Sequence, residues 1–254
     1  MTAFTLERVD RYCAAEDLCP GARGAELQSF YEHLKNGAGR TVLELGSGNG
    51  TLTRCLTEMG WTVDTVDIAF QAPPGARRHY AADIAGGLGF LPQEAAYDAV
   101  VSLAVLHHVV ACPGRLPDNL ANAGALMVLQ DVPARELLAR PAKPSIQMIG
   151  DGRRAAMTTA RIFAELVDPY SVPTHNGVYL HMAAVGEQLA SEFAPVERFY
   201  HRCDWRFPDR DVAARYVHSL FNLDLGQDAV LEVLETALRA VGDGVALPWA
   251  LGWL

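Results

Sequence analysis

Residues 41–50 read Thr-Val-Leu-Glu-Leu-Gly-Ser-Gly-Asn-Gly, an apolar run followed by three glycines within five positions. A short apolar run that ends at glycines is typical of a buried β-strand that enters a sharp turn. Apolar residues at 52, 55, 56 and 59 then have helical spacing, and Gly60 is a suitable C-cap. A second strand-like run over 61–67 ends at Asp67. The order strand, glycine turn, helix, strand, acid predicts the first half of a nucleotide-binding βαβ fold.

The spacing of the glycines indicates which kind of nucleotide the turn would bind. A dinucleotide site needs G-x-G-x-x-G, with the pyrophosphate on the helix N-terminus. Here the spacing from Gly46 to Gly50 is G-x-G-x-G, and Thr51 follows. Asp67 lies 21 positions after Gly46, where a carboxylate at a strand end can accept hydrogen bonds from ribose hydroxyls. The pattern therefore predicts an adenosine site without a full phosphate cradle.

Four ordered stretches resemble the motifs of one enzyme family. Glu44–Gly50 is similar to motif I of the class I S-adenosylmethionine (SAM)-dependent methyltransferases, and Val66-Asp67-Ile68 is similar to their second motif. Ala82-Asp83-Ile84 and Tyr97–Val109 extend the resemblance, which covers about residues 30–133. It implies SAM as the cofactor and an α/β fold with a doubly wound, mostly parallel sheet of seven strands. N-terminal helices and an inserted cap are expected from the residues on either side of this stretch.

The chain is expected to divide into four parts around this core. These are an N-terminal helical cover (1–38), a SAM-binding core (39–133), an inserted cap over the substrate (134–177) and the C-terminal part of the sheet with its helices (178–254). The cap is indicated by several prolines and a Gly-Asp-Gly turn, which do not fit a compact core. The remaining predicted elements are helices over 4–14, 24–36, 158–166, 178–190, 211–223 and 228–241, and strands over 79–82, 97–103, 125–132, 196–201 and 245–254, the last one antiparallel.

The resemblance assigns the cofactor to the carboxyl ends of four strands. Asp83 would accept a hydrogen bond from the adenine amino group while Ile84 covers the ring. The alternative is that Asp83 only caps the next turn. Ser102 and Leu103 are expected beside the first glycine, because ligands bind where the strand order of an open sheet reverses. The full predicted cofactor set is Glu44, Gly46, Ser47, Gly48, Asn49, Gly50, Asp67, Ile68, Asp83, Ile84, Ser102 and Leu103.

His108, Asp131 and His175 are the candidates for a catalytic base. An acceptor hydroxyl or amine has to lose a proton during methyl transfer, and a histidine or carboxylate can take it. Each candidate also has a purely structural reading: His108 as a packed helix residue, Asp131 as a loop anchor after the fifth strand, and His175 as a solvent-facing loop residue. A carbon or sulfur acceptor would need positioning alone.

The substrate is expected to contact Tyr31, Tyr170 and His107. Tyr31 belongs to an apolar stripe on the helix over 24–36, which could pack on the sheet, cover the cofactor, or do both. No metal is expected, because the adjacent His107 and His108 would point about 100° apart on a helix and would not chelate one ion.

Composition limits the compartment and the partners. The chain has 21 Lys and Arg against 30 Asp and Glu, a net charge of −9, whereas proteins that bind a phosphate backbone carry a basic face. Five scattered cysteines suggest neither a disulfide framework nor a zinc site. Neither a signal peptide nor a membrane span is recognisable. We expect a cytoplasmic protein with a small-molecule substrate and without nucleic-acid or membrane partners; a homodimer is left open.

The predicted function is methyl transfer from SAM to oxygen, nitrogen or carbon of a small molecule, with secondary metabolism as a suggested setting. The alternative keeps the SAM-binding fold but catalyses an isomerisation or cyclisation without methyl transfer, because function depends on the site rather than on the fold. Methylation of protein or RNA is a third option, and it would require a basic groove.

Overall fold

The computed structural model describes residues 6–36, 38–68, 71–84, 87–92, 95, 97–105, 127–131, 147–148, 152–171, 187 and 199–253. The strands are β1 (Thr41–Leu45), β2 (Thr62–Asp67), β3 (Ala76–Ala81), β4 (Ala99–Leu103), β5 (Met127–Asp131), β6 (Gln147–Met148), β7 (Phe199–Arg202), β8 (Trp205–Phe207), β9 (Arg239–Val241), β10 (Gly244–Leu247) and β11 (Ala250–Trp253). The helices are α1 (Leu6–Leu18), α2 (Gly24–Leu34), α3 (Thr51–Glu58), α5 (Gly152–Ile162), the π-helical η4 (Phe163–Val167), α6 (Asp168–Tyr170), α8 (Arg210–Leu220) and α9 (Gln227–Glu235).

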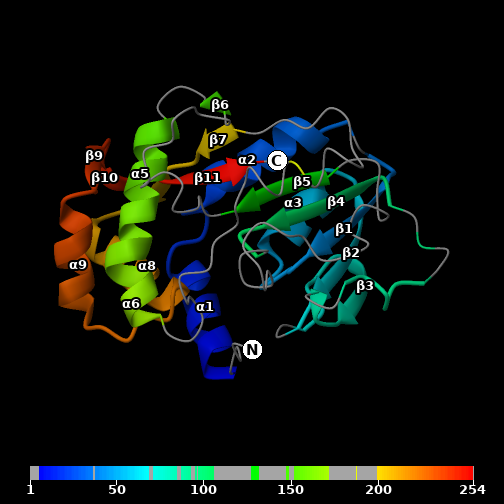
Figure 1. Cartoon of the computed structure of the whole chain (residues 1–254), viewed down its shortest axis with the longest axis horizontal. Helices are drawn as coiled ribbons and strands as arrows, with labels where there is room; N and C mark the ends of the chain where they lie inside the picture. Colours follow the sequence, from blue (N-terminus) through cyan, green and yellow to red (C-terminus); the bar gives the residue numbers. More distant parts are fainter. Residues whose placement is uncertain are drawn as a thin grey trace.

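The main sheet combines parallel strands with one antiparallel strand (Figure 1). Parallel pairing joins β3, β2, β1, β4 and β5 in that spatial order. Next to β5, β11 pairs antiparallel with both β5 and β7, and β6 pairs parallel with β7 at the edge. The predicted α/β fold is confirmed. The described part of the sheet has eight strands rather than the expected seven, because the two-residue β6 extends it beyond β7.

The strand order reverses between β1 and β4. From β1 the chain proceeds to β2 and β3 on one side, and then to β4 and β5 on the other. Leu45 of β1 pairs with Val66 of β2 and with Ser102 of β4, so the carboxyl ends of these strands lie level with one another. A crevice for a ligand is expected at this point of an open α/β sheet.

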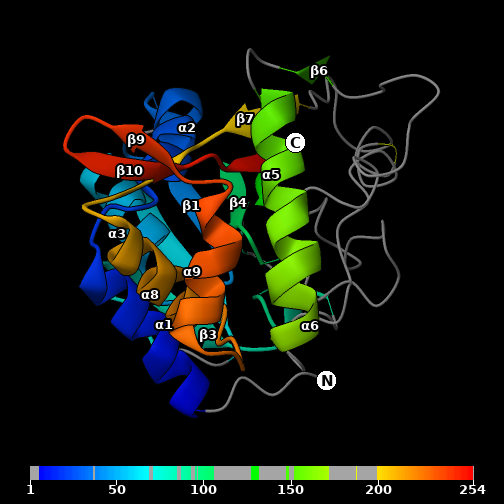
Figure 2. The ribbon, with the colours of Figure 1, turned by 90° about the vertical axis from the view of Figure 1, so that its left-hand side faces the viewer.

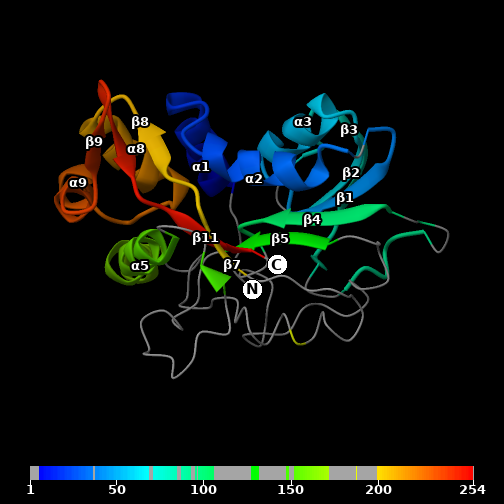
Figure 3. The same ribbon diagram turned by 90° about the horizontal axis from the view of Figure 1, so that it is seen from above.

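A hydrophobic core under α2 and α3 supports the parallel strands. Phe30 and Leu34 of α2 and Leu52 and Leu56 of α3 pack against apolar side chains of the sheet. Their spacing of four residues places each pair on one helical face. Trp61 donates its indole N–H to the carbonyl of Leu34 at 3.0 Å. Figure 3 shows α2 and α3 along one side of the sheet.

The C-terminal elements form a second core around stacked aromatic rings. The rings of Trp205 and Trp249 have centroids 4.0 Å apart, and Phe221 packs beside them. α8 packs against α1 and α9, and Figure 2 shows these three helices side by side. α5 packs against β7 and β11, where Thr159 accepts a hydrogen bond from the Ala250 N–H at 2.9 Å.

Two C-terminal predictions are wrong in extent. The helix predicted over 228–241 ends at Glu235, and Arg239–Val241 form β9, because a tight turn with Gly242 at φ +58° pairs this segment with β10. The predicted strand over 245–254 is divided at Pro248, which has no N–H for a ladder. Its first part belongs to the small sheet β8-β10-β9, and its second part is β11, antiparallel as predicted.

Most other predicted elements agree with the structure to within a few residues. The helix predicted over 158–166 is longer, since it begins at Gly152 and continues through η4. The helix predicted over 178–190 lies outside the described residues except for residue 187. The division into cover, core, cap and C-terminal part remains a prediction. Within the described ranges, no helix is both long and apolar enough to cross a membrane.

Candidate functional site

The glycine turn between β1 and α3 lies at the reversal of the strand order. Gly46, Gly48 and Gly50 have φ of +72°, +53° and +84°, where L side chains are strained. A Cβ atom on Gly46 would lie 2.3 Å from the Val105 side chain, and one on Gly50 would lie 2.5 Å from Pro73. Both positions therefore require glycine for conformation and for space.

Hydrogen bonds tie this turn to the end of β2. The N–H groups of Gly46 and Ser47 both donate to the carbonyl of Val66, at 2.8 and 3.2 Å. The N–H of Gly48 donates to Oδ2 of Asp67 at 2.9 Å. The structure thus brings together the glycine turn and the strand-end carboxylate that the sequence selected separately.

Asn49 stabilises the start of α3. Its Oδ1 accepts hydrogen bonds from the N–H of Thr51 at 3.2 Å and from the Thr51 hydroxyl at 2.8 Å. The first N–H groups of any α-helix lack partners within the helix and carry partial positive charge. The turn therefore presents a helix end that suits an anionic or hydrogen-bond-accepting group.

Two buried serine hydroxyls at the site have no hydrogen-bond partner among the described residues: those of Ser47, 5% exposed, and Ser102, 1% exposed. Ser102 pairs with Leu45, the residue before the turn. Buried hydroxyls in proteins are nearly always hydrogen-bonded. A polar ligand bound at the carboxyl ends of β1 and β4 would supply the partners that these two hydroxyls lack.

Glu44 is a buried acid directly beneath the turn. It is 1% exposed, and Oε2 of its carboxyl group accepts a hydrogen bond from the Thr53 hydroxyl at 2.6 Å. Burial raises the pKa of Glu44 to about 8; the Thr53 hydrogen bond opposes this shift and the charge of Asp67 adds to it. Glu44 is therefore mostly protonated at neutral pH in the ligand-free protein.

The other predicted cofactor residues lie at the ends of β2, β3 and β4. Ile68 follows Asp67 and is 65% exposed, an unusual position for a large apolar side chain that would suit contact with a planar ring. Asp83 is exposed and Ile84 is buried after β3. Leu103 is half-buried at the end of β4 and packs against both cores.

The predicted substrate and catalytic residues are only partly described. Tyr31 is exposed on α2, and Tyr170 is exposed at the end of α6. Asp131 ends β5, where its backbone pairs with Gly252 of β11. His107, His108 and His175, for which roles were also predicted, lie outside the described residues. The roles of these six residues stay predictions.

Tyr12 of α1 also lies near the glycine turn, although it was not among the predicted site residues. A Cβ atom on Gly48 would lie 3.9 Å from both Cε1 and the hydroxyl oxygen of Tyr12, an ordinary van der Waals distance. The hydroxyl accepts a hydrogen bond from Nη1 of Arg23 at 3.1 Å. The only sequence signal for Tyr12 was an aromatic residue on a helix of the expected N-terminal cover, because no local motif surrounds it.

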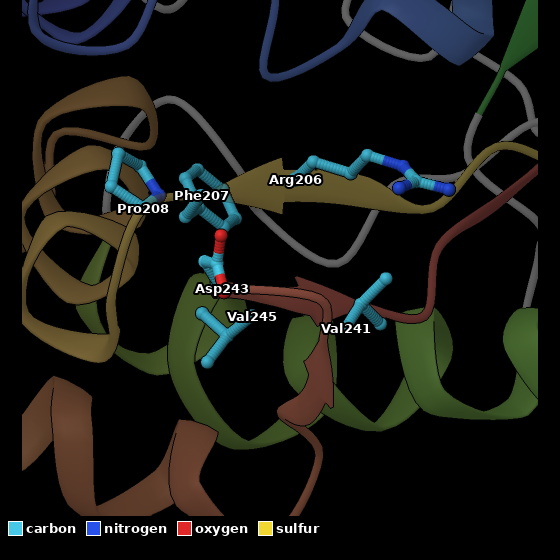
Figure 4. A pocket seen from close by; sticks show the side chains of 7 residues that line it. Arg206, Phe207, Pro208, Val241, Asp243 and Val245 are labelled. Atoms are coloured by element: carbon cyan, nitrogen blue, oxygen red, sulfur yellow. The ribbon is translucent and has the colours of Figure 1, made fainter.

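A pocket of about 360 Å³ lies in the small sheet rather than at the glycine turn. Figure 4 shows Phe207, Asp243 and Val245 at this pocket, which contains none of the predicted site residues. In the described part of the chain, no group of three or more His, Cys, Asp or Glu side chains is placed to hold a metal ion.

Comparison with protein families gives one match that spans more than half of the chain. A family model described as a methyltransferase domain matches residues 21–171. This range includes the glycine turn, Asp67 and the end of β4. Among curated proteins, no sequence matches.

Comparison with solved structures gives likenesses at low sequence identity. A Bacillus halodurans C-125 protein assigned as a methyltransferase has a TM-score of 0.51 at 11% identity, over 91% of this chain and 97% of that one. A cyclopropane-fatty-acyl-phospholipid synthase-like protein from Lactobacillus casei has a TM-score of 0.47 at 16% identity, over 96% and 98%. Coclaurine N-methyltransferase, bound to N-methylheliamine and S-adenosylhomocysteine (SAH), has a TM-score of 0.44 at 12% identity, over 91% and 72%. Identities this low concern the fold alone.

Proposed function

Since the chain belongs to the methyltransferase domain family and is a SAM-dependent methyltransferase, we propose that it transfers the methyl group to a small-molecule acceptor. The observation that carries the cofactor site is the glycine turn at the strand-order reversal, held to Asp67 and flanked by two buried serine hydroxyls without partners among the described residues. The net charge of −9 supports a small molecule over a nucleic acid as acceptor.

The residues of the crevice fit the adenosine part of the cofactor. Asp67 would accept hydrogen bonds from the ribose hydroxyls, as strand-end acids do in nucleotide-binding folds. Ile68 and Ile84 would contact the faces of the adenine ring, and Asp83 would accept a hydrogen bond from the adenine amino group. The exposed apolar surface of Ile68 supports this assignment, because contact with a ring would remove that surface from water.

The residues nearest β1 and β4 fit the polar end of the cofactor. The Ser47 and Ser102 hydroxyls would find partners on its carboxylate and ammonium groups. Bound SAM supplies a methyl group on a positively charged sulfur. The protein's own contribution would be to hold the acceptor in line with that methyl group and to exclude water, since alignment of two reactants supplies several kcal/mol of the barrier.

A hydroxyl or amine acceptor would also need a base, and His108, Asp131 and His175 are the proposed candidates. A positioned base contributes on the order of 10²–10⁴-fold to the rate of such a proton transfer. Residues 134–177 would form the cap over this acceptor, and secondary metabolism is the proposed setting.

Calorimetric titration of SAM and SAH into Asp67→Ala tests the cofactor site. We expect the affinity to fall about 100-fold, because two hydrogen bonds to a carboxylate together contribute roughly 3 kcal/mol. Asp98→Ala is the matched control, since Asp98 accepts from the N–H of Thr41 at 2.8 Å at the opposite end of β1. It should bind the cofactor within about twofold of the wild type. Wild-type affinity in Asp67→Ala would refute the site.

Release of SAH during turnover tests the reaction class. SAH formed in step with the product supports methyl transfer. A product that forms without SAH release would instead support the alternative, an isomerisation or cyclisation on a SAM-binding fold.

A further inference from the structure

A buried ionic cluster lies beside the glycine turn, at the junction of α1 and α2. Arg23 contacts Oε2 of Glu26 through Nε at 2.8 Å and Nη2 at 2.6 Å, and its Nη1 lies 3.6 Å from Glu16. The side chains of Arg23 and Glu16 are 12% and 11% exposed, and that of Glu26 is fully buried. Charged groups this deeply buried are stable only when they are paired and hydrogen-bonded.

Two side chains of the C-terminal core donate hydrogen bonds to the carboxylates of Glu26 and Glu16. The indole N–H of Trp205 donates to Glu26 at 2.6 Å, and the Tyr216 hydroxyl donates to Glu16 at 2.6 Å. The guanidinium of Arg23 also lies 5.7 Å from the centroid of the Trp205 ring. A planar guanidinium with these partners has one favourable orientation, because its N–H groups form a rigid fork.

The guanidinium group of Arg23 also contacts Tyr12. Nη1 of Arg23 donates to the Tyr12 hydroxyl at 3.1 Å. Tyr12 in turn lies within van der Waals distance of a methyl group placed on Gly48, while the N–H of Gly48 is bound to Asp67. The central glycine of the turn is therefore flanked by Asp67 on β2 and by Tyr12 on α1.

We propose that Arg23 is a positioning residue for cofactor binding, which holds Tyr12 against Gly48 so that α1 closes one side of the glycine turn. The inference rests on the proposed function, since the turn is where the cofactor would bind. A side chain that is already held in place does not have to be ordered when the ligand binds. Arg23 thus contributes to cofactor affinity from within the cluster, through the Tyr12 hydroxyl.

A double-mutant cycle on the full chain tests this, with SAH and SAM as the calorimetric probes. Tyr12→Phe removes the hydroxyl and keeps the ring, and Arg23→Lys keeps the charge beside Glu26 but loses the fork. Each single variant should bind SAH about tenfold more weakly. The double variant should be within about twofold of the weaker single variant, because both changes remove the same hydrogen bond.

Tyr216→Phe is the matched control, because it removes another hydroxyl from the same cluster, one that donates to Glu16 from α8. It should lower the thermal unfolding midpoint while SAH affinity stays within about twofold of the wild type. Tyr12→Phe and Tyr216→Phe are the same chemical change. Comparing their SAH affinities therefore tests the role of the Tyr12 hydroxyl even if Arg23→Lys does not fold.

The inference would be overturned if SAH affinity were unchanged in Tyr12→Phe, or if the losses in the double variant were fully additive. An equal loss of affinity in Tyr216→Phe would also overturn it, because the effect would then be general destabilisation. Failure of the wild-type chain to bind SAM or SAH is a different outcome, which refutes the proposed function itself.

Discussion

The buried carboxyl of Glu44 should make the stability of the ligand-free protein depend on pH. Its ordinary pKa of 4.5 rises to about 8 in the folded chain, primarily because burial disfavours the charged form. Above pH 4.5 the unfolded chain releases this proton while the folded chain retains it. The contribution of protonated Glu44 to the free energy of unfolding is therefore fully present below pH 4.5 and is lost as the pH rises to about 8.

The size of the effect follows from the two pKa values. Between these two pKa values, each increase of one pH unit lowers the free energy of unfolding by about 1.4 kcal/mol. Between pH 5 and pH 8 the wild-type protein should therefore lose about 3.5 kcal/mol through this one group. That is a large fraction of the roughly 5–15 kcal/mol by which a typical domain is stable.

Glu44→Gln isolates this contribution. Glutamine has nearly the same shape and keeps an oxygen that can accept the hydrogen bond from Thr53, but it does not ionise. Urea unfolding, followed by tryptophan fluorescence at several pH values, should show the variant gaining about 3.5 kcal/mol relative to the wild type between pH 5 and pH 8.

Glu58→Gln, at an exposed position of the neighbouring α3, controls for the loss of a carboxylate. It should differ from the wild type by less than about 0.5 kcal/mol at both pH values. A stability difference between Glu44→Gln and the wild type that is the same at pH 5 and pH 8 would refute the reasoning, because it would mean that Glu44 ionises alike in the folded and unfolded chains.

Two further substitutions test the packing around the site. Gly46→Ala should lower the free energy of unfolding in urea by about 2–4 kcal/mol, since its Cβ would lie 2.3 Å from Val105 at φ +72°. The control Gly39→Ala, at φ +82° with nothing within 4 Å, should lower it by only about 1 kcal/mol. Equal losses in the two variants would contradict the steric explanation. Arg77→Met should cost about 2–3 kcal/mol, because it leaves the fully buried Asp64 without its ion pair at 2.7 Å; a change in unfolding free energy below about 0.5 kcal/mol would show that the pair adds nothing to stability.

The glycine turn and its acid could be predicted from sequence because they depend on contacts within one βαβ unit. Gly48 and Asp67 are only 19 residues apart. The buried run before the turn, the glycines at positive φ and the helix after it are all specified by neighbouring residues. Short-range geometry therefore sufficed to place Asp67 against the turn.

The pairing of the C-terminal run over 245–254 does not follow from its local sequence. Its apolar character correctly predicts a strand, but β10 and β11 pair with partners in two different sheets. Which partner each half meets depends on the course of the whole chain. Hydrophobicity alone does not contain that information, because any open strand edge offers the same backbone N–H and C=O groups.

Tyr12 and the cluster around Arg23 depend on folding over much longer distances. The hydrogen bond from Trp205 to Glu26 joins residues 179 apart, and that from Tyr216 to Glu16 joins residues 200 apart. The raised pKa of Glu44 likewise arises from burial by the assembled chain. The sequence determined the chemistry of the turn through local backbone preference, whereas the packing of distant segments determined which side chains surround it and how its buried acid is charged.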